Sequence, residues 1–496
     1  MPLRPLTREQ TWLLPPTLDE LVPQDHPARF VAAFVDALDR CAWEELGIAI
    51  DGESLGAPEY HPRGLLSVWL YGFMTRTRSS RKLEAACRDQ IPYLWLTGWQ
   101  HPDHNTLWRF YRDHRVSMRK LFKRTVQTAV KMDLVDLAVQ AVDGTKIVAN
   151  AADGRTCDAE QLKRLLKRTE KTIEELEREN EIGSDPPPVH LPEKLAGAQQ
   201  LRDHVRAAMK QLAEQEGRKR INLTDADAEL MKSHQGMVVG YNGQAMVSPV
   251  KIEEKDTGLI ITAADVTTNA SDAGHLVPML EQAEENTGKR AEVSLADAGY
   301  HSGRNLESCA QRKQVVVMPE TTQRALEKPY HKDRFKYDEN TDTYTCPQGQ
   351  VLHFRRMKNT KGTLVRQYWA SRPVCRQCLA FNTCTKNKTH GRLIEIGPHE
   401  VLLRQHRAWM ATEEAKAAYS RRKELPEPAF GILKEQMGMR RFLLRGRENV
   451  KAEWIIVATT FNLRTLWRCW IKGKLQDLCQ RVLSAAKPVV ECPIPL

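Results

Sequence analysis

Apolar and aromatic residues recur every three or four positions through much of the first 135 residues. Residues 63–96 and 104–132 show this spacing most clearly, with arginines and lysines between the apolar positions. Asp103 or Asn105 can cap the second segment. The pattern predicts a helical N-terminal region over residues 1–135. Short basic helices of this kind are equally typical of a small DNA-binding region and of an ordinary helical domain.

The periodicity changes at residue 136. Residues 136–150, DLAVQAVDGTKIVAN, alternate β-branched and small apolar residues before a glycine, which predicts a strand, a turn and a second strand. Residues 236–266 predict two or three strands, with turns at 241–243 and 255–258. A helix is expected over residues 275–286.

A short buried strand follows that helix and ends at Asp297, before a loop and another helix. Strands and helices in this order predict an α/β fold. Residues 411–475 again show helical spacing, with a break at Gly446.

A heptad pattern occupies residues 158–217. Its apolar positions are Leu162, Leu166, Thr169, Ile173 and Leu176, and then Leu201, Val205, Ala208 and Leu212. The stretch GSDPPPVHLP lies between the two sets and cannot continue a helix. We expect an antiparallel helical hairpin inserted into a larger domain. The spacing does not distinguish a role in dimerisation from a role in DNA binding.

The composition excludes several classes of protein. A chain of 496 residues with 41% hydrophobic content can build sizeable cores, roughly three domains by length, and is neither disordered nor fibrous. No apolar run reaches the roughly 18 residues that a membrane-spanning helix needs. The N-terminus lacks the apolar segment of a signal peptide, so we expect a cytoplasmic protein.

The formal net charge of +11 is concentrated in two C-terminal blocks. Residues 355–392 hold ten Lys or Arg and no Asp or Glu, and residues 416–472 hold thirteen against five Glu. The rest of the chain is therefore net negative. Clustered positive charge favours a polyanionic partner, most commonly nucleic acid, over an ordinary solvated basic face.

Four of the eleven cysteines lie close together in the sequence: Cys346, Cys375, Cys378 and Cys384. Two of them form a C-x-x-C, which suits two thiolates of a zinc knuckle, and the four together match the four ligands that structural zinc takes. A C-x-x-C can instead be redox-active, although no thioredoxin-like βαβ unit surrounds this one. We expect a structural zinc site without an open coordination position.

Asp143, Asp297 and Glu427 are candidates for metal-assisted phosphodiester chemistry, which needs about three carboxylates for hard divalent ions. Both aspartates end predicted strands, where α/β sites commonly form, and Glu427 lies in the first turn of a predicted helix. Asp265 ends the similar segment LIITAAD. A strand-end Asp is more often a turn residue, so the residues alone leave the choice between Asp265 and Asp297 open.

Three acidic motifs in one order give the most specific signal. They are VDGTK at 142–146, ADAGYHS at 296–302, and the block from Tyr419 to Lys434 that ends EPAFGILK. With RRFLLRG at 440–446 and the N-terminal segments YHPRGLLSVWLYGF and HPDHNTLWRF, they resemble bacterial insertion-sequence DDE transposases of the long subgroup with a four-cysteine insertion. The resemblance covers nearly the whole chain.

This resemblance implies that Asp143, Asp297 and Glu427 form a catalytic triad holding Mg²⁺ or Mn²⁺. Tyr419, Arg422 and Lys434 match the signature around the Glu, and would contact DNA or position a phosphate. The chain departs from the family at Pro426, usually Val, which is tolerated at the start of a helix. The gap between Arg422 and Glu427 is also one residue longer than in shorter related transposases.

The implied fold is an RNase H-like core, a mixed sheet flanked by helices, with Asp143 on the first strand, Asp297 just after the fourth and Glu427 on a later helix. The 130 residues between Asp297 and Glu427 are too many for a plain loop, so a folded insertion is expected there. The expected organisation is a helical N-terminal DNA-binding region (1–135), a first part of the core (136–157 and 221–330), a helical-hairpin insertion (158–220), a zinc-ribbon-like insertion (331–395), C-terminal core helices (396–475) and a tail (476–496).

The implied activity is transposition: hydrolysis of DNA at the ends of the element, followed by transfer of the freed 3′-hydroxyl strand to target DNA. A metal-dependent nuclease without strand transfer and a non-catalytic DNA-binding regulator are the alternatives, although the intact triad argues against the regulator. The partner would be double-stranded DNA, bound by a homodimer because two ends must be held, with the protein nucleoid-associated when bound. The arginines expected to contact the DNA backbone are Arg440, Arg441, Arg445 and Arg447.

Overall fold

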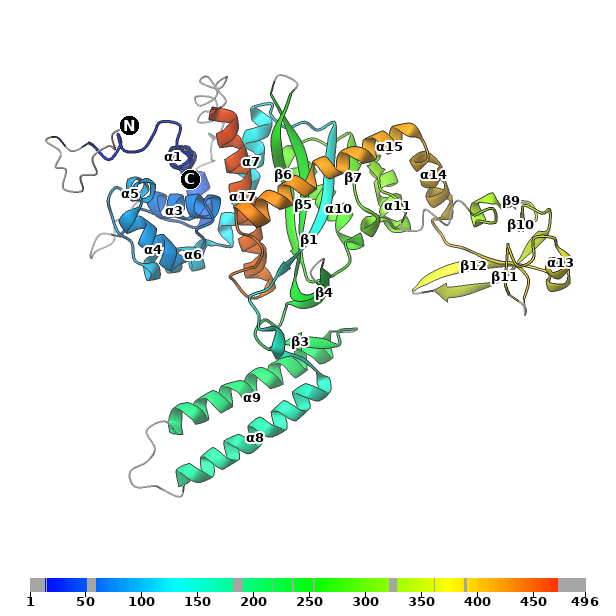
Figure 1. Cartoon of the computed structure of the whole chain (residues 1–496), viewed down its shortest axis with the longest axis horizontal. Coiled ribbons are helices and arrows are strands. Elements are labelled where there is room, and N and C mark those ends of the chain that lie inside the picture. The colour runs from blue at the N-terminus through cyan, green and yellow to red at the C-terminus, as the bar shows by residue number, and fades with distance from the viewer. Residues whose placement is uncertain are drawn as a thin grey trace, which may run out of the picture.

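The computed structural model describes residues 14, 16–50, 59–181, 191–215, 217–233, 236–252, 255–320, 328–360, 362–387 and 390–471. A central sheet is flanked by helices, with the N-terminal helices on one side and a second, smaller sheet on the other (Figure 1). A pair of long helices projects away from the central sheet (Figure 1).

The central sheet is mixed. It contains β1 (Val139–Val148), β4 (Glu229–Ser233), β5 (Gly236–Ile252), β6 (Lys255–Thr267), β7 (Val293–Leu295) and β8 (Val315–Val317). Strand β5 pairs antiparallel with β4 and β6 and, along its other edge, with β1. Strands β7 and β8 follow β1 in parallel, with Ala141 opposite Leu295. The carboxyl ends of β1 and β7 therefore face the same edge of the sheet.

The turn predicted at residues 241–243 is wrong. Tyr241–Gly243 lies inside β5, which continues unbroken past it. A Cβ on Gly243 would lie 3.1 Å from the Trp454 ring, so this glycine allows the close approach of a helix rather than a turn. The predicted turn at residues 255–258 is also wrong, because these residues begin β6.

Helices cover both faces of the central sheet because side chains alternate along each strand. Val142 and Met246 face a cluster with α10 (Leu276–Thr287) and α11 (Gly303–Gln311). Ala141 and Ala245 face the opposite side, which contains α17 (Arg447–Ile471). The Trp454 indole N–H of α17 donates to the Gln244 carbonyl at 2.9 Å and fixes this helix against β5.

The N-terminal helices pack against α17 and share its hydrophobic core. They are α1 (Pro27–Asp36), α2 (Arg40–Leu46), α3 (Pro62–Met74), α4 (Ser80–Asp89), α5 (Ile91–Thr97), α6 (His104–His114) and α7 (Lys120–Lys131). A buried ion pair joins the two parts: Arg78 Nη1 lies 2.8 Å from Glu453 Oε1, and the side chains are 9% and 1% exposed. The described part of this region is therefore packed against the core.

The projecting pair consists of α8 (Ala159–Glu181) and α9 (Leu191–Glu214), which lie side by side (Figure 1). Leu162 on α8 and Val205 on α9 are fully buried, together with Ile221. Strands β2 (Thr156–Asp158) and β3 (Arg220–Asn222) pair antiparallel and close the base of the pair. The heptad positions thus face one another in an otherwise exposed element.

The smaller sheet has the order β13-β12-β11-β10-β9 and is antiparallel throughout. Its strands are β9 (Lys336–Asp338), β10 (Thr343–Thr345), β11 (Val351–Thr360), β12 (Thr363–Ala370) and β13 (Leu393–Ile396), and α13 (Arg372–Gln377) follows β12. It has a hydrophobic cluster of its own, including Phe335, Tyr368 and Cys375. We call residues 330–396 the cysteine module.

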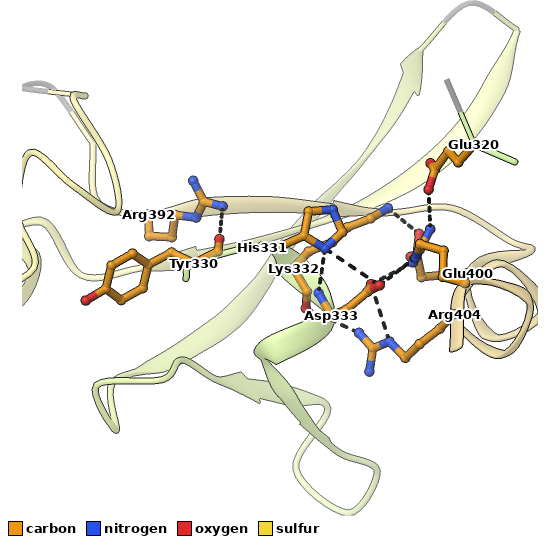
Figure 2. Close-up of polar contacts among 9 residues, drawn as sticks. Glu320, Tyr330, His331, Lys332, Asp333, Arg392, Glu400 and Arg404 are labelled. Carbon is orange, nitrogen blue, oxygen red and sulfur yellow. Dashed lines mark hydrogen bonds and ion pairs between the residues drawn. The ribbon is translucent and has the colours of Figure 1, made fainter. Parts of the chain in front are cut away.

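A buried ion network fastens the cysteine module to α14 (Glu400–Met410) (Figure 2). Both Asp333 oxygens accept from Arg407, at 2.5 and 2.6 Å. Glu400 accepts from the same guanidinium at 2.6 Å and also pairs with Lys332. Because each charge has an opposite partner, the network holds the module in a defined orientation.

The C-terminal helices contain more breaks than the spacing predicts. After α14 come α15 (Glu413–Ser420), the 3₁₀ turn η6 (Arg421–Glu424), α16 (Pro426–Gly431) and the π-helical turn η7 (Ile432–Gln436). The expected break at Gly446 is present, with φ of 81° just before α17 begins. The tail at 476–496 lies outside the described residues. Within the described ranges, no helix is long and apolar enough to span a membrane.

Candidate active site

Asp143 and Asp297 lie together at one edge of the central sheet. Asp143 is on β1, and Asp297 follows β7, the parallel neighbour of β1. Each carboxylate accepts from a backbone N–H close to it in the chain: Gly144 N–H donates to Asp143 Oδ1 and Gly299 N–H donates to Asp297 Oδ1, both at 2.8 Å. Two residues separated by 154 positions in the sequence thus share one site. The turn predicted after Asp143 is wrong, because β1 runs unbroken through Gly144.

Arg422 and Tyr419 lie against the two aspartates. Arg422 Nη2 is 2.8 Å from Asp143 Oδ2, and the two side chains are 12% and 17% exposed. Tyr419, at the end of α15, is half-buried beside Arg422, Asp143 and Asp297, and burial raises its pKa. Arg422 therefore points into the site, which favours positioning of a reacting group over an outward contact with DNA.

Burial shifts the protonation of Asp143. Desolvation raises its pKa to about 6; Arg422 opposes the shift, and the negative charges of Asp297 and Asp272 add to it. A carboxylate in this environment gains stability from a nearby cation. The site is therefore electrostatically suited to a divalent ion or to a second basic group.

Sequence reasoning missed Asp272, which lies in the loop after β6 and beside the site. Asp272 Oδ1 accepts from Asn242 at 2.6 Å and from Gln244 at 2.7 Å. Gln244 in turn accepts a hydrogen bond from the buried Tyr300 hydroxyl, three residues after Asp297. This network connects β5 to the Asp297 loop. The paired amides on β5 are its only sequence signal, and they become informative only once β5 is known to be a single strand.

No hydrogen bond or ion pair joins Glu427 to Asp143 or Asp297 in the described residues. The Glu427 side chain is exposed in the first turn of α16, and across the described ranges it makes no hydrogen bond or ion pair with any other residue. Its helix begins soon after the turn that holds Arg422 and contacts β1 and β5. Across the described parts of the chain, no three His, Cys, Asp or Glu side chains are grouped closely enough to hold a metal ion.

Asp265 is separate from the site. It lies on β6, and its carboxylate pairs with Lys451 of α17 at 2.8 Å. The structure thus resolves the choice between Asp265 and Asp297 that the residues alone left open, because only Asp297 adjoins Asp143.

The other basic residues that were predicted to contact DNA lie in the segment after α16 and at the start of α17. Lys434, in η7, is half-buried and lines a pocket beside Gly144 together with the exposed Arg440. Arg441 and Arg445 are exposed too, and their guanidinium groups donate to the carbonyls of Ala149 (3.3 Å) and Asn150 (2.9 Å), just after β1. Arg447 is exposed at the start of α17.

The four clustered cysteines line one small cavity in the cysteine module. The Gln350 N–H donates to Cys346 Sγ and the Arg392 N–H to Cys375 Sγ, both at 3.3 Å. Burial raises the pKa of the Cys384 thiol, Arg392 lowers it, and the other three sulfurs raise it further. The fold brings together thiols that are up to 38 positions apart in sequence.

Two protein-family models match parts of the chain. Residues 16–113 match a transposase domain of the DUF772 family, and residues 345–467 match a transposase DDE domain. The second match includes Glu427 and the four cysteines but neither Asp143 nor Asp297. No curated protein matches the chain.

A DDE transposase domain implies an RNase H-like core, and the mixed sheet flanked by helices is consistent with that core. Such domains imply DNA binding and generally use a divalent metal such as Mg²⁺. The two matches confirm the resemblance found in the motifs and indicate an insertion-sequence DDE transposase.

Proposed function

We propose that this protein cleaves DNA at the ends of its insertion sequence and transfers the freed 3′-hydroxyl strand to target DNA. The observation that carries this proposal is the convergence of Asp143, in the middle of β1, and Asp297, just after the parallel strand β7, with Arg422 paired to Asp143. Carboxylates beside exposed basic residues suit a metal-assisted reaction on a phosphodiester.

The proposed metal ligands are Asp143, Asp297 and Glu427, for Mg²⁺ or Mn²⁺. The raised pKa of Asp143 fits such a site, since its burial near other carboxylates favours a cation. A bound divalent ion would supply Lewis acidity and an activated water. The Gly144 and Gly299 N–H groups hold one oxygen of each aspartate, and Arg422 orients the second oxygen of Asp143. Glu427, exposed on α16, is accessible from solvent.

A structural Zn²⁺ is proposed for Cys346, Cys375, Cys378 and Cys384. The four sulfurs line one cavity, backbone N–H groups already donate to two of them, and four cysteine ligands are what structural zinc takes. Such a site would stabilise the fold of the cysteine module rather than take part in the reaction.

The DNA contacts, assembly and domain roles are also proposals. Arg440, Arg441, Arg445 and Arg447 would contact the DNA backbone, and two DNA ends would be held by a homodimer. The boundaries expected from the sequence remain our proposal for the domain organisation, including a DNA-binding role for residues 1–135, as does association with the nucleoid.

The test is cutting and joining of DNA that carries the inverted repeats flanking the gene. Asp143→Asn and Glu427→Gln are expected to abolish both steps while DNA binding persists. Asp265→Asn is the matched control, because Asp265 is also a strand aspartate after an apolar run but pairs with Lys451 outside the site. This variant is expected to remain active. Retained cutting and joining by Asp143→Asn would refute the proposal.

The same assay separates the alternatives. Cutting without joining would indicate a nuclease, whereas DNA binding that is unaffected by EDTA, with no Mg²⁺-dependent activity, would indicate a regulator.

A further inference from the structure

A pocket of about 530 Å³ opens beside the aspartate site. Four separate segments of the fold supply its polar lining: β1 with Gly144 and Lys146, β4 with Lys232, the loop after β6 with Asp272, and the segment after α16 with Lys434 and Arg440. The pocket adjoins the aspartate site through Asp272, because a Cβ on Gly299 would lie 3.4 Å from Asp272 Oδ2 and 3.0 Å from Asp297 Oδ1.

Positive charge dominates the lining. It contains four cations and one carboxylate, Asp272. That carboxylate is already engaged, because its Oδ1 accepts from Asn242 and Gln244 and lies 3.4 Å from Lys146 Nζ. The three remaining cations are therefore not neutralised by Asp272.

The four cations differ in the contacts that they already make with other protein groups. Arg440 pairs with Glu435, and Lys146 also donates to the Ala270 carbonyl at 3.0 Å. Lys232 is exposed and has no ion pair or side-chain hydrogen bond within the described residues.

The half-buried Lys434 is held in an environment that disfavours its charged form. Burial lowers its pKa, and the neighbouring Arg440 lowers it further. An anion in the pocket would offset this repulsion, as a phosphate does at other clustered cations.

We infer that this pocket binds neighbouring phosphodiester groups of the DNA strand that enters the aspartate site, with Lys232 and Lys146 as phosphate contacts in addition to Lys434. The inference rests on the proposed function. It adds a defined path for the substrate strand and two residues outside the motif around Glu427. Fixing the phosphates next to the scissile one would orient the reacting bond.

Lysine acetylation locates the contact between the pocket and the DNA. The full-length protein is acetylated with and without a short DNA duplex, and the modified lysines are identified by mass spectrometry. Lys232 and Lys434 are expected to be protected when the duplex is bound. Lys289 is the matched control, because it is exposed and precedes β7, at the end of the sheet opposite to Asp297. Its acetylation should not change.

Salt-dependent affinity for the same duplex measures the contribution of Lys232. Each phosphate contact contributes about 0.9 to the slope of log affinity against log salt for duplex DNA. Lys232→Glu is expected to weaken binding and to lower the slope by about 0.9 or more. Lys232→Arg, which keeps the positive charge, should retain the wild-type affinity and slope. Lys289→Glu should change the slope less than Lys232→Glu does.

An unprotected Lys232, or a Lys232→Glu protein with the wild-type affinity and slope, would overturn this inference while leaving cutting and joining intact. A wild-type protein that binds DNA with Lys232 protected but shows no Mg²⁺-dependent cutting would instead refute the proposed function.

Discussion

Removing the charge of Glu453 tests how the N-terminal helices are fastened to the core. The carboxylate is almost fully buried and pairs with Arg78 at 2.8 Å. It also accepts from the backbone N–H groups of Leu443 and Leu444, at 3.0 and 3.1 Å. Arg78 donates in addition to the Gly438 carbonyl at 2.6 Å. One ion pair therefore joins α17, the segment before it and the loop between α3 and α4.

Glu453→Gln keeps the side-chain volume but leaves the Arg78 guanidinium buried without a counter-charge. Removing one partner of a buried pair typically costs about 3–5 kcal/mol. We expect a loss of about 4 kcal/mol in the free energy of unfolding. Arg78→Met should cost a similar amount, and the double variant should cost less than the sum of the two by about 0.5–3 kcal/mol.

Urea titration, followed by tryptophan fluorescence and circular dichroism, measures these differences. Hydrogen exchange should also accelerate in the segment that holds Leu443 and Leu444, because their backbone N–H groups lose a charged acceptor. Asp113→Asn is the control, since Asp113 pairs with Arg112 on the surface, each side chain being 50% exposed, and it should leave the free energy of unfolding close to that of the wild type. A cost below about 1 kcal/mol for Glu453→Gln, or unchanged exchange in that segment, would refute the reasoning.

Three further predictions concern the sites. Burial raises the pKa of Asp143 from 3.8 to about 6, so its ionisation destabilises the folded state progressively as pH rises from about 4 to 6. In metal-free urea titrations, Asp143→Asn should therefore raise the free energy of unfolding by up to about 3 kcal/mol above pH ~7 and change it little near pH ~4. An equal gain at both pH values would contradict this. Gly144→Ala places a Cβ 2.5 Å from Asp272 Oδ1, so it should lower the stability measured by thermal unfolding by about 1–3 kcal/mol and reduce DNA cutting. Gly274→Ala is the control: its Cβ meets nothing within 4 Å, so both stability and cutting should be unchanged. Purified protein should contain one zinc per chain by elemental analysis, and Cys378→Ser should lose it; a metal-free, fully folded wild type would count against the site.

Asp143 and Asp297 could be found from the sequence because each follows a short apolar run and lies in a distinctive motif, although β1 continues past Asp143. Asp272 could not, since it lies in a polar loop and gains meaning only from its contacts with β5. The choice between Asp265 and Asp297 also needed the strand order, because both end similar apolar runs and only β7 adjoins β1.

Glycine caused the clearest error in the fold. Gly243, preceded by Asn242, has the composition of a hairpin turn, yet Trp454 packs over it from a helix that begins about 200 residues later. A contact at that separation leaves no local signal. The heptad positions were predictable for the opposite reason, since α8 and α9 bury them against each other with little help from the rest of the chain.

The dimensions of α8 and α9 have a mechanical consequence. At 1.5 Å per residue, the 23 residues of α8 span about 35 Å, so the pair acts as a lever that extends from the base formed by β2 and β3. A rotation of about 10° at that base would displace the far end by about 6 Å, slightly more than the 5.4 Å pitch of a helix. The position of the far end of α8 is therefore sensitive to the orientation of the three-residue strands β2 and β3 at the base.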